Sequence, residues 1–178
     1  EGAKPGEANT DWGAVDPTQN NVSGYFNVLP GEKFLDPVES PRNCNWFLLT
    51  LGCRRGLTFL EQQPEVDGKR LGSRGHSMGG NLTMYVAGSD TRVKVASPSV
   101  GGSGFRTYSR YGLPPQIRNV KGDLELFRRT MGYQFYAPRI TAPLLHLGAS
   151  NDFHGQIDAT YATGAQVKKT LIRSLLSE

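Results

Sequence analysis

The stretch RLGSRGHSMGGNLTMY, residues 70–85, constrains the fold of this chain more than any other. A short strand-like run leads into it and an apolar, helix-like run leaves it, so that Ser77 stands at their junction. The spacing from Gly75 to Gly79 fits the pattern G-x-S-x-G, in which a serine is presented at a sharp strand-to-helix turn. Such a turn strains the serine backbone, and small flanking residues are needed because side chains there would collide with the strand and the helix. We therefore predict a nucleophile elbow formed by Gly75, His76 and Gly79 around Ser77.

A simpler explanation of Ser77 is that its side chain caps the helix, because serine is a favoured N-cap residue. The strand before it and the helix after it favour the elbow instead. A helix beginning near Met78 would point its first amide groups and the positive end of its dipole toward the serine. We therefore predict that the N–H of Met78 is an oxyanion donor, a role worth about 3 kcal/mol per donor.

The length of 178 residues suits one domain, and a hydrophobic content of 37% allows a packed core. The 20 basic and 16 acidic residues are spread along the chain, which argues against nucleic-acid binding. No apolar run reaches the roughly 20 residues of a membrane span. The polar start lacks both a signal peptide and a methionine, so we interpret the chain as the interior of a longer protein of undetermined compartment. Cys44 and Cys53 are too few for a disulfide framework, and free thiols are expected, with a bridge between them as the alternative.

Strand-like and helix-like segments alternate along the chain. Residues 1–43 form an irregular, loop-rich lead-in, and residues 104–140 form a long excursion that resembles a lid insertion. The alternation predicts a single α/β domain over residues 1–178, with parallel strands and helices on both faces of the sheet. Helices are expected at 45–63, 78–90, 122–131 and over most of 156–178, and strands within 70–77, 91–102 and 142–152.

Three polar loops follow the ends of the expected strands. They contain Ser77, residues 97–102 and residues 151–154. Because ligands bind beyond the carboxyl ends of parallel strands, we expect an active site there. Asp152 lies in the third loop and follows Ser77 in the chain, as a Ser-acid-His order requires, so we predict it to be the acid. A turn cap is the structural alternative for Asp152, and Asp158 is a weaker candidate for the acid.

The base is harder to identify because the chain has only three histidines. His76 adjoins the nucleophile, but neighbouring side chains diverge in a tight turn. His146 lies in an apolar strand, where a core position with satisfied hydrogen bonds is the ordinary interpretation. His154 lies near Asp152 on the correct edge and is the candidate base, although the acid would then orient a histidine only two residues away. The base is therefore the weakest member of the predicted triad of Ser77, Asp152 and His154.

No metal or cofactor site is predicted. The sequence lacks clustered histidine, cysteine or acidic ligands with usable spacing, and GGSG near residue 101 is too short for a dinucleotide fingerprint. Aromatic residues in the excursion are expected to be core or interface packing, with a lid or a sugar-stacking wall as the alternative. They are Phe105, Tyr108, Tyr111, Tyr133, Phe135 and Tyr136.

Two segments resemble a known superfamily. They are RGLTFLEQQPEVDGKRLGSRGHSMGGNLTMYVAGSDTRVKVASPSVGG and YAPRITAPLLHLGASNDFHG, within residues 45–155. The resemblance is to the α/β-hydrolase superfamily, and more narrowly to bacterial proteins classed as acetyl xylan esterase-like or dienelactone hydrolase-like. It implies a mostly parallel sheet flanked by helices, and a Ser-Asp-His triad that cleaves carboxylic esters, often acetyl groups on carbohydrate. Members of this family are often secreted or periplasmic.

By position, the resemblance gives Ser77 as nucleophile, Met78 as oxyanion donor and Asp152 as acid. It also implies a sheet that is incomplete at both ends. The first strands and the loop with the second oxyanion donor would precede the chain. The last strand and the catalytic histidine would follow residue 178.

Three functions stay open from the sequence. The first is a serine carboxylesterase, or its central part, that acts through Ser77 on a small-molecule or carbohydrate ester without a cofactor. The second is a non-catalytic α/β-hydrolase-like module, or an inactive fragment that lacks the catalytic histidine. The third is a prolyl-oligopeptidase-like peptidase that uses the same elbow and acid loop. The oligomeric state, including a homo-oligomer, is also open.

Overall fold

The computed structural model describes residues 40–102, 124–152 and 156–175. Most of the expected lead-in, residues 104–123 of the excursion and the candidate base His154 lie outside these residues. Helices and strands alternate along the described chain. The helices are α1 (Asn45–Glu61), α2 (Met78–Ser89), α3 (Leu124–Met131), α4 (Tyr133–Tyr136) and α5 (Ile157–Gly164). The strands are β1 (Gly72–His76), β2 (Val95–Ser99), β3 (Leu144–Ala149) and β4 (Thr170–Leu175). Short 3₁₀ turns are η2 (Pro41–Asn43), η3 (Gly68–Arg70) and η4 (Ala137–Arg139).

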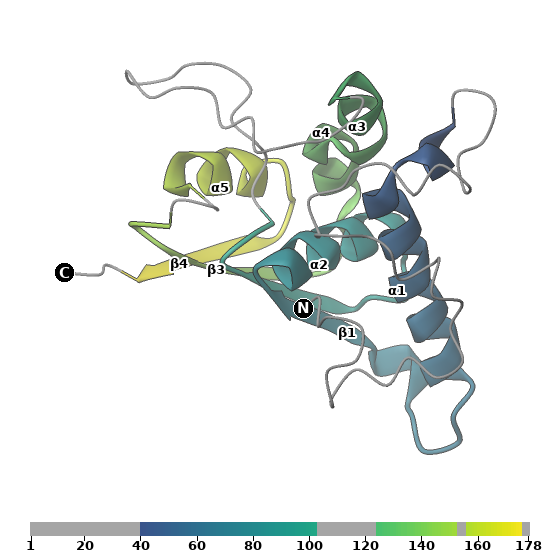
Figure 1. Ribbon diagram of the computed structural model, residues 1–178. Coiled ribbons are helices and arrows are strands. Elements are labelled where there is room, and N and C mark those ends of the chain that lie inside the picture. The colour runs from purple at the N-terminus through teal and green to yellow at the C-terminus, as the bar shows by residue number, and fades with distance from the viewer. Residues whose placement is uncertain (1–39, 103–123, 153–155, 176–178) are drawn as a thin grey trace, which may run out of the picture.

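The four strands form one parallel sheet in the order β1-β2-β3-β4 (Figure 1). Gly72 of β1 pairs with Val95 of β2, and Leu144 of β3 pairs with Thr170 of β4. Parallel neighbours must be joined by a crossover, and each connection here contains a helix. The parallel pairing expected from the alternation is confirmed, and all four carboxyl ends lie at one edge of the sheet.

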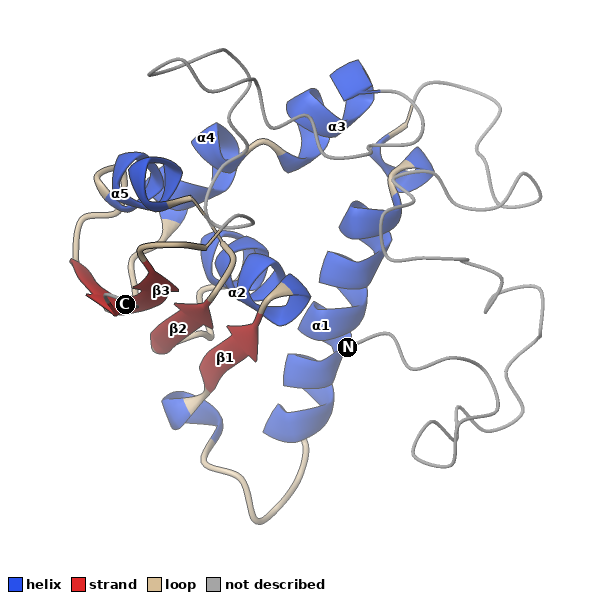
Figure 2. Cartoon of the chain, turned by 60° about the vertical axis from the view of Figure 1, so that its left-hand side comes forward, coloured by secondary structure: helices blue, strands red, loops and turns tan. Residues whose placement is uncertain are grey.

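Helices α2 and α5 cover the same face of the sheet (Figures 1 and 2). Helix α2 packs on β1 and β2, and α5 packs on β3 and β4. Alternate strand residues point to this face, so Ala96, Pro98, Leu144 and His146 are buried. Val95, on the opposite face, is 50% exposed. The described helices that pack on the sheet thus gather on one face, whereas the alternation predicted helices on both.

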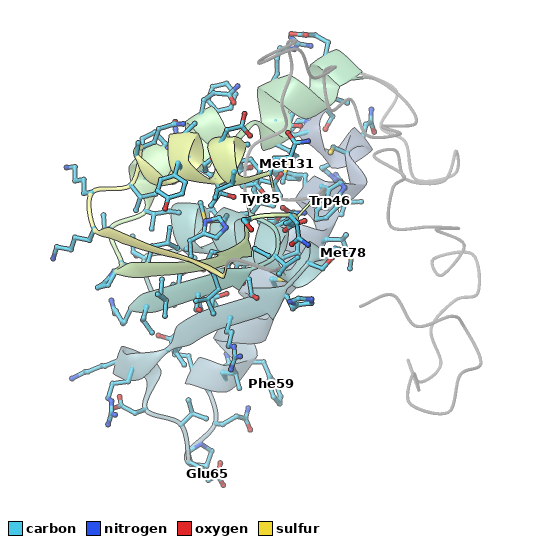
Figure 3. The ribbon with its side chains drawn as sticks, turned by 90° about the vertical axis from the view of Figure 1, so that its left-hand side faces the viewer. Trp46, Phe59, Glu65, Met78, Tyr85 and Met131 are labelled. Carbon is cyan, nitrogen blue, oxygen red and sulfur yellow. The ribbon has the colours of Figure 1, made fainter. Side chains whose placement is uncertain are left out.

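The core lies between α1, α2 and the segment from α3 to η4. Tyr85 of α2 is fully buried at its centre, near Trp46 and Met131 (Figure 3). The ring of Tyr133 stacks on that of Tyr85 with centroids 5.0 Å apart, and Tyr136 meets it edge-on at the same distance. Such aromatic pairs contribute about 0.5–1.5 kcal/mol each beyond the area that they bury. Tyr133 and Tyr136 are therefore core residues and not part of a lid.

The chain beyond residue 164 forms a strand where a helix was expected. Sequence analysis predicted a mostly helical segment over 156–178, but α5 ends at Gly164, and β4 then pairs with β3 along its whole length. Short apolar runs fit helical and strand periodicity alike, and here the edge of β3 supplies hydrogen-bonding partners for a strand. The resemblance placed the last strand after residue 178, but a strand that follows β3 and α5 is present within the chain as β4.

Both cysteines are free thiols, and the alternative of a bridge between them is wrong. Burial raises the pKa of Cys44 and of Cys53, so both thiols stay protonated at neutral pH. None of the helices in the described ranges is both long enough and apolar enough to cross a membrane.

Candidate active site

Ser77 is the single residue between β1 and α2, and its backbone is strained. Its φ of 54° and ψ of −114° lie outside the regions that L-residues ordinarily occupy. Such conformations cost about 1–3 kcal/mol and persist only where the surrounding structure enforces them. The side chain makes no capping hydrogen bond to α2. The helix-cap explanation of this serine is therefore wrong.

Main-chain contacts with the end of β2 hold the turn at Ser77. Its N–H donates to the carbonyl oxygen of Ser99 at 2.8 Å, and its carbonyl oxygen accepts from the N–H of Asn81 at 3.2 Å. A Cβ on Gly101 would overlap that same carbonyl oxygen of Ser77, and the φ of 148° at Gly101 itself favours glycine. The loop after β2 therefore lies directly against Ser77, as the predicted strand-end site requires.

Two glycines of the elbow are needed for close packing, and they are Gly75 and Gly80. A Cβ on Gly75 would overlap the backbone of Gly79, and a Cβ on Gly80 would lie 2.9 Å from the carbonyl oxygen of Ser99. A Cβ on Gly79 would meet no atom within 4 Å. The expectation that Gly79 avoids a collision of its own is therefore wrong. Residue 75 must be glycine because the backbone of residue 79 lies against it, and that backbone would be the same with any side chain at residue 79.

Asn81 joins the first turn of α2 to the loop after β2. Its Oδ1 accepts one hydrogen bond from the N–H of Gly102 and another from the hydroxyl of Tyr133, both at 2.7 Å. Gly102 is buried with a φ of 81°, so a loop in an unusual conformation depends on this acceptor. Sequence analysis missed Asn81. The available signal was an amide side chain in an otherwise apolar helix, one turn after the serine.

Asp152 follows β3, and its N–H donates to the carbonyl oxygen of Ala149 at 3.2 Å. His146 of β3 is 1% exposed, and its Nδ1 has no hydrogen-bond partner among the residues that the structure describes. Burial lowers the pKa of His146, while a hydrogen bond to the backbone of Gly101 and the charge of Asp152 act in the opposite direction. His146 thus interacts with both the loop after β3 and the loop that touches Ser77. The interpretation of His146 as a core histidine with satisfied hydrogen bonds is right about its burial and wrong about Nδ1, which has no partner among the described residues.

Several solved structures of hydrolases share this arrangement of strands and helices. An acetyl xylan esterase from Paenibacillus sp. R4 matches with a TM-score of 0.61 and 23% identity, over 79% of this chain and 50% of the esterase. Acetyl xylan esterase 1 from Thermoanaerobacterium sp. JW/SL YS485 matches with a TM-score of 0.60 and 18% identity, over 78% of this chain and 50% of the esterase. An acylaminoacyl peptidase from Pyrococcus horikoshii matches with a TM-score of 0.54 and 21% identity, over 82% of this chain and 24% of the peptidase. No protein-family model matches the sequence, and a search of curated proteins also finds no match.

The chain has an α/β-hydrolase-type fold. At these identities the likeness establishes the fold alone, and activity is a separate question. The chain spans 50% of the length of each of the two esterases. In this hydrolase-type fold the parallel sheet flanked by helices is confirmed, and Ser77 lies at a turn between a strand and a helix.

No hydrogen bond joins Ser77 to either histidine of the described part of the hydrolase-type fold. His76 is exposed, and its Nδ1 lies 3.3 Å from the hydroxyl oxygen of Ser99. His146 is buried on β3. The candidate His154 lies outside the described residues, so its role stays a prediction.

The electrostatic environment of Ser77 is set by the start of α2. Met78 is the first residue of this helix, so its N–H belongs to the amide groups that have no carbonyl partner within the helix. These groups carry the positive end of the helix dipole and suit a developing negative charge. Within residues 40–102, 124–152 and 156–175, no group of three histidine, cysteine or acidic side chains could hold a metal ion.

Proposed function

We propose that this chain carries the nucleophile and the acid of a serine hydrolase that cleaves carboxylic esters. The observation that carries the proposal is the backbone of Ser77, held at a φ of 54° between β1 and α2 with a side chain that does not cap the helix. Strain of this kind costs stability, and it clusters at sites where function uses it. The likeness to two acetyl xylan esterases supports acetyl esters of carbohydrate as the substrate class.

In the proposed reaction, the hydroxyl oxygen of Ser77 forms a bond to the carbonyl carbon of the ester while its proton passes to a base. The π electrons of the carbonyl move to its oxygen, and the N–H of Met78 donates to the oxyanion. When the oxyanion collapses, the bond to the alcohol oxygen breaks, and the alcohol leaves with the proton held by the base. Water then adds to the acyl-serine with help from the same base, releasing the carboxylic acid and restoring Ser77.

Asp152 is the proposed acid, and it would orient the base histidine. The base is either His154 or a histidine that follows β4, where the hydrolase pattern places it. The register of the sheet supports the second assignment, because Ala149 of β3 pairs with Leu175 of β4. The carboxyl end of β4 therefore lies at the same edge of the sheet as the loop that carries Asp152, since parallel strands end at the same edge.

A fluorophosphonate probe tests the nucleophile, because it phosphonylates activated serines. If His154 is the base, we expect the chain to be labelled and the variant Ser77→Ala to be unlabelled. If the base is a histidine beyond residue 178, labelling should appear only when the segment that carries it is present. The matched control Ser73→Ala removes a half-buried hydroxyl from β1 of the same elbow and should keep the label. A folded protein that stays unlabelled even with that segment present would favour the non-catalytic module, and labelling of the Ser77→Ala variant would move the nucleophile elsewhere.

A peptidase is the second candidate, because an acylaminoacyl peptidase matches over 82% of this chain. Rates with p-nitrophenyl acetate and with acetyl-alanine p-nitroanilide separate the two, since one scissile bond is an ester and the other an anilide. We expect hydrolysis of the ester alone, lost in the Ser77→Ala variant. Hydrolysis of the anilide at a comparable rate would support the peptidase. Acetate release from acetylated xylan tests the carbohydrate substrate.

A further inference from the structure

A cavity of about 610 Å³ lies at the end of α2 that is remote from Ser77. Its wall includes Ser89, the last residue of α2, together with residues of α1 and of the segment from α3 to η4. Helix α2 has 12 residues, so its two ends are roughly 17 Å apart along the axis. The cavity is therefore separate from the proposed active site.

Three arginines from three elements line this cavity: Arg54 of α1, Arg129 of α3 and Arg139 of η4. Arg139 is exposed, and within the described ranges no hydrogen bond or ion pair engages its guanidinium. Arg129 pairs with Glu125, whose carboxylate oxygen lies 4.0 Å from its Nε. The cationic groups thus converge from different sides on one space.

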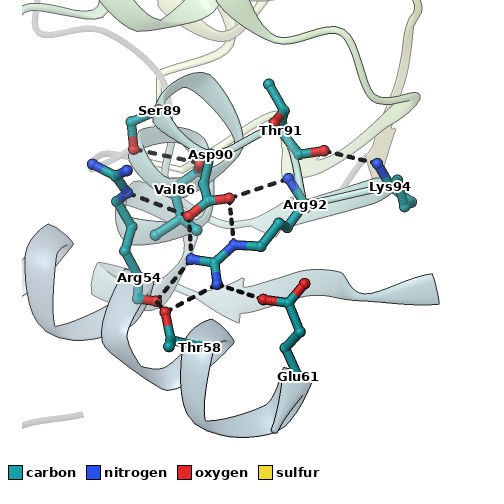
Figure 4. Close-up of polar contacts among 9 residues, drawn as sticks. All are labelled: Arg54, Thr58, Glu61, Val86, Ser89, Asp90, Thr91, Arg92 and Lys94. Carbon is teal, nitrogen blue, oxygen red and sulfur yellow. Dashed lines mark hydrogen bonds and ion pairs between the residues drawn. The ribbon is translucent and has the colours of Figure 1, made fainter. Parts of the chain in front are cut away.

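Asp90 accepts a hydrogen bond from only one of the three guanidinium nitrogens of Arg54. The Nε of Arg54 donates to Asp90 Oδ2 at 3.3 Å, and its two terminal nitrogens point away from that carboxylate (Figure 4). Arg92 donates to both oxygens of Asp90, at 2.9 and 2.7 Å. Asp90 itself lines the cavity, and Arg92, which does not, pairs with both Asp90 and Glu61, the latter at 3.1 Å. The three arginines of the lining still outnumber its one carboxylate, so the cavity keeps an excess of positive charge.

Aromatic rings form another part of the wall. Phe135, Tyr136 and Phe47 line the cavity, and Phe135 is 43% exposed. Burial raises the pKa of the Tyr136 hydroxyl, and the charges of Arg139 and Arg54 oppose that rise. Arg54, Arg139 and these rings line the same cavity, so a ligand there would meet cations and an apolar surface together.

We propose that this cavity binds a small organic anion, with its carboxylate or phosphate group on Arg139 and Arg54 and its apolar body against Phe135 and Tyr136. Guanidinium groups bind such oxyanions through paired, charge-assisted hydrogen bonds, which are about twice as strong as neutral ones. The binding site goes beyond the proposed hydrolase and does not depend on Ser77.

Calorimetric titration with phenyl phosphate, benzoate, inorganic phosphate and benzyl alcohol tests the proposal on the full chain. We expect at least one of the two aromatic anions to bind several-fold more tightly than inorganic phosphate, and benzyl alcohol not to bind. Arg139→Gln should weaken binding about tenfold, because it removes a charge-assisted contact. Arg55→Gln is the matched control: Arg55 adjoins Arg54 on α1, is exposed and does not line the cavity, so its loss should change affinity less than twofold.

The Ser77→Ala variant should bind the anion as the unaltered chain does, which separates this test from that of the hydrolase. Phenyl phosphate and benzoate both failing to bind would overturn the proposal. Equal weakening by Arg139→Gln and Arg55→Gln would also overturn it, because the effect would then reflect net charge. Inorganic phosphate binding as tightly as the aromatic anions would contradict the role given to the aromatic wall.

Discussion

The N–H of Ser77 donates a 2.8 Å hydrogen bond to the carbonyl oxygen of Ser99, and this bond fastens the elbow to the end of β2. Gly101, two residues further along, lies so close to the carbonyl oxygen of Ser77 that a Cβ there would overlap it. The strained backbone of Ser77 is therefore maintained by a neighbouring strand and its loop as well as by its own flanking glycines. Changes in either place should act on the same turn.

Gly75→Ala and Gly79→Ala should have opposite effects on stability. A Cβ at residue 75 would overlap the backbone of Gly79, so we expect the free energy of unfolding to fall by about 2–4 kcal/mol. A Cβ at residue 79 would meet open space in the first turn of α2, and replacing a helical glycine should raise the free energy of unfolding by about 0.5 kcal/mol. Urea unfolding of the two variants measures both values. Equal losses in the two variants would contradict this account of the elbow.

Asn81→Ala should lower the free energy of unfolding by about 1–3 kcal/mol, because the N–H of Gly102 and the hydroxyl of Tyr133 lose their shared acceptor. Asn81→Asp retains an acceptor oxygen and should cost less. Adding Tyr133→Phe to Asn81→Ala should cost less than the same change in the unaltered chain, since the hydroxyl of Tyr133 would already have lost its bond to Asn81. A double-mutant cycle in urea measures this coupling. A coupling of zero would show that the Asn81–Tyr133 bond contributes nothing.

The elbow was predictable because its determinants are adjacent in the sequence. Gly75, Ser77 and the start of an apolar helix at Met78 lie within four residues, and the structure places a strained turn there. Parallel pairing followed in the same way from alternating segments, because only a crossover connects parallel neighbours.

The parts that could not be predicted depend on contacts between distant residues. Asn81 bonds to Gly102 and Tyr133, which lie 21 and 52 residues further along the chain. Residues 170–175 become β4 because β3 offers a free edge, and that edge is invisible in the local pattern of the segment. Arg54 and Arg139 line one cavity although separate elements carry them. In each case the folded neighbour decides the role of the residue.

Asp90→Asn should lower the free energy of unfolding at pH 6 by about 2 kcal/mol. The difference in this free energy between the variant and the unaltered chain should shrink as the pH falls. Hydrogen bonds from Arg92 lower the pKa of Asp90 to about 2, and its side chain is only 5% exposed (Figure 4). A carboxylate whose pKa is depressed by folding stabilises the fold above its unfolded value near 4, and loses that contribution as the pH falls toward the folded value. Roughly half of the difference between the two chains should therefore be gone at pH 3.

Urea unfolding at pH 6 and pH 3 measures that difference. The control Asp67→Asn makes the same change at an exposed residue and keeps an acceptor oxygen for the N–H of Lys69, so it should cost less than about 1 kcal/mol at pH 6. A loss for Asp90→Asn that is the same at both pH values would show that the cost is one of packing and not of charge.

His146 should make the fold less stable as the pH falls from 7 to 5. Burial lowers the pKa of its ring, so the unfolded chain takes up a proton at a pH where the folded chain does not. Because the unfolded state then binds more protons, the free energy of unfolding rises with pH in this range, by at most about 1.4 kcal/mol per pH unit for one group. His146→Gln should remove this part of the slope, whereas His76→Gln, which replaces an exposed ring, should leave it in place. Urea unfolding at pH 5, 6 and 7 compares the three chains. A slope that survives His146→Gln would assign the pH dependence to other groups and would mean that the ring of His146 can be protonated within the fold, next to Asp152.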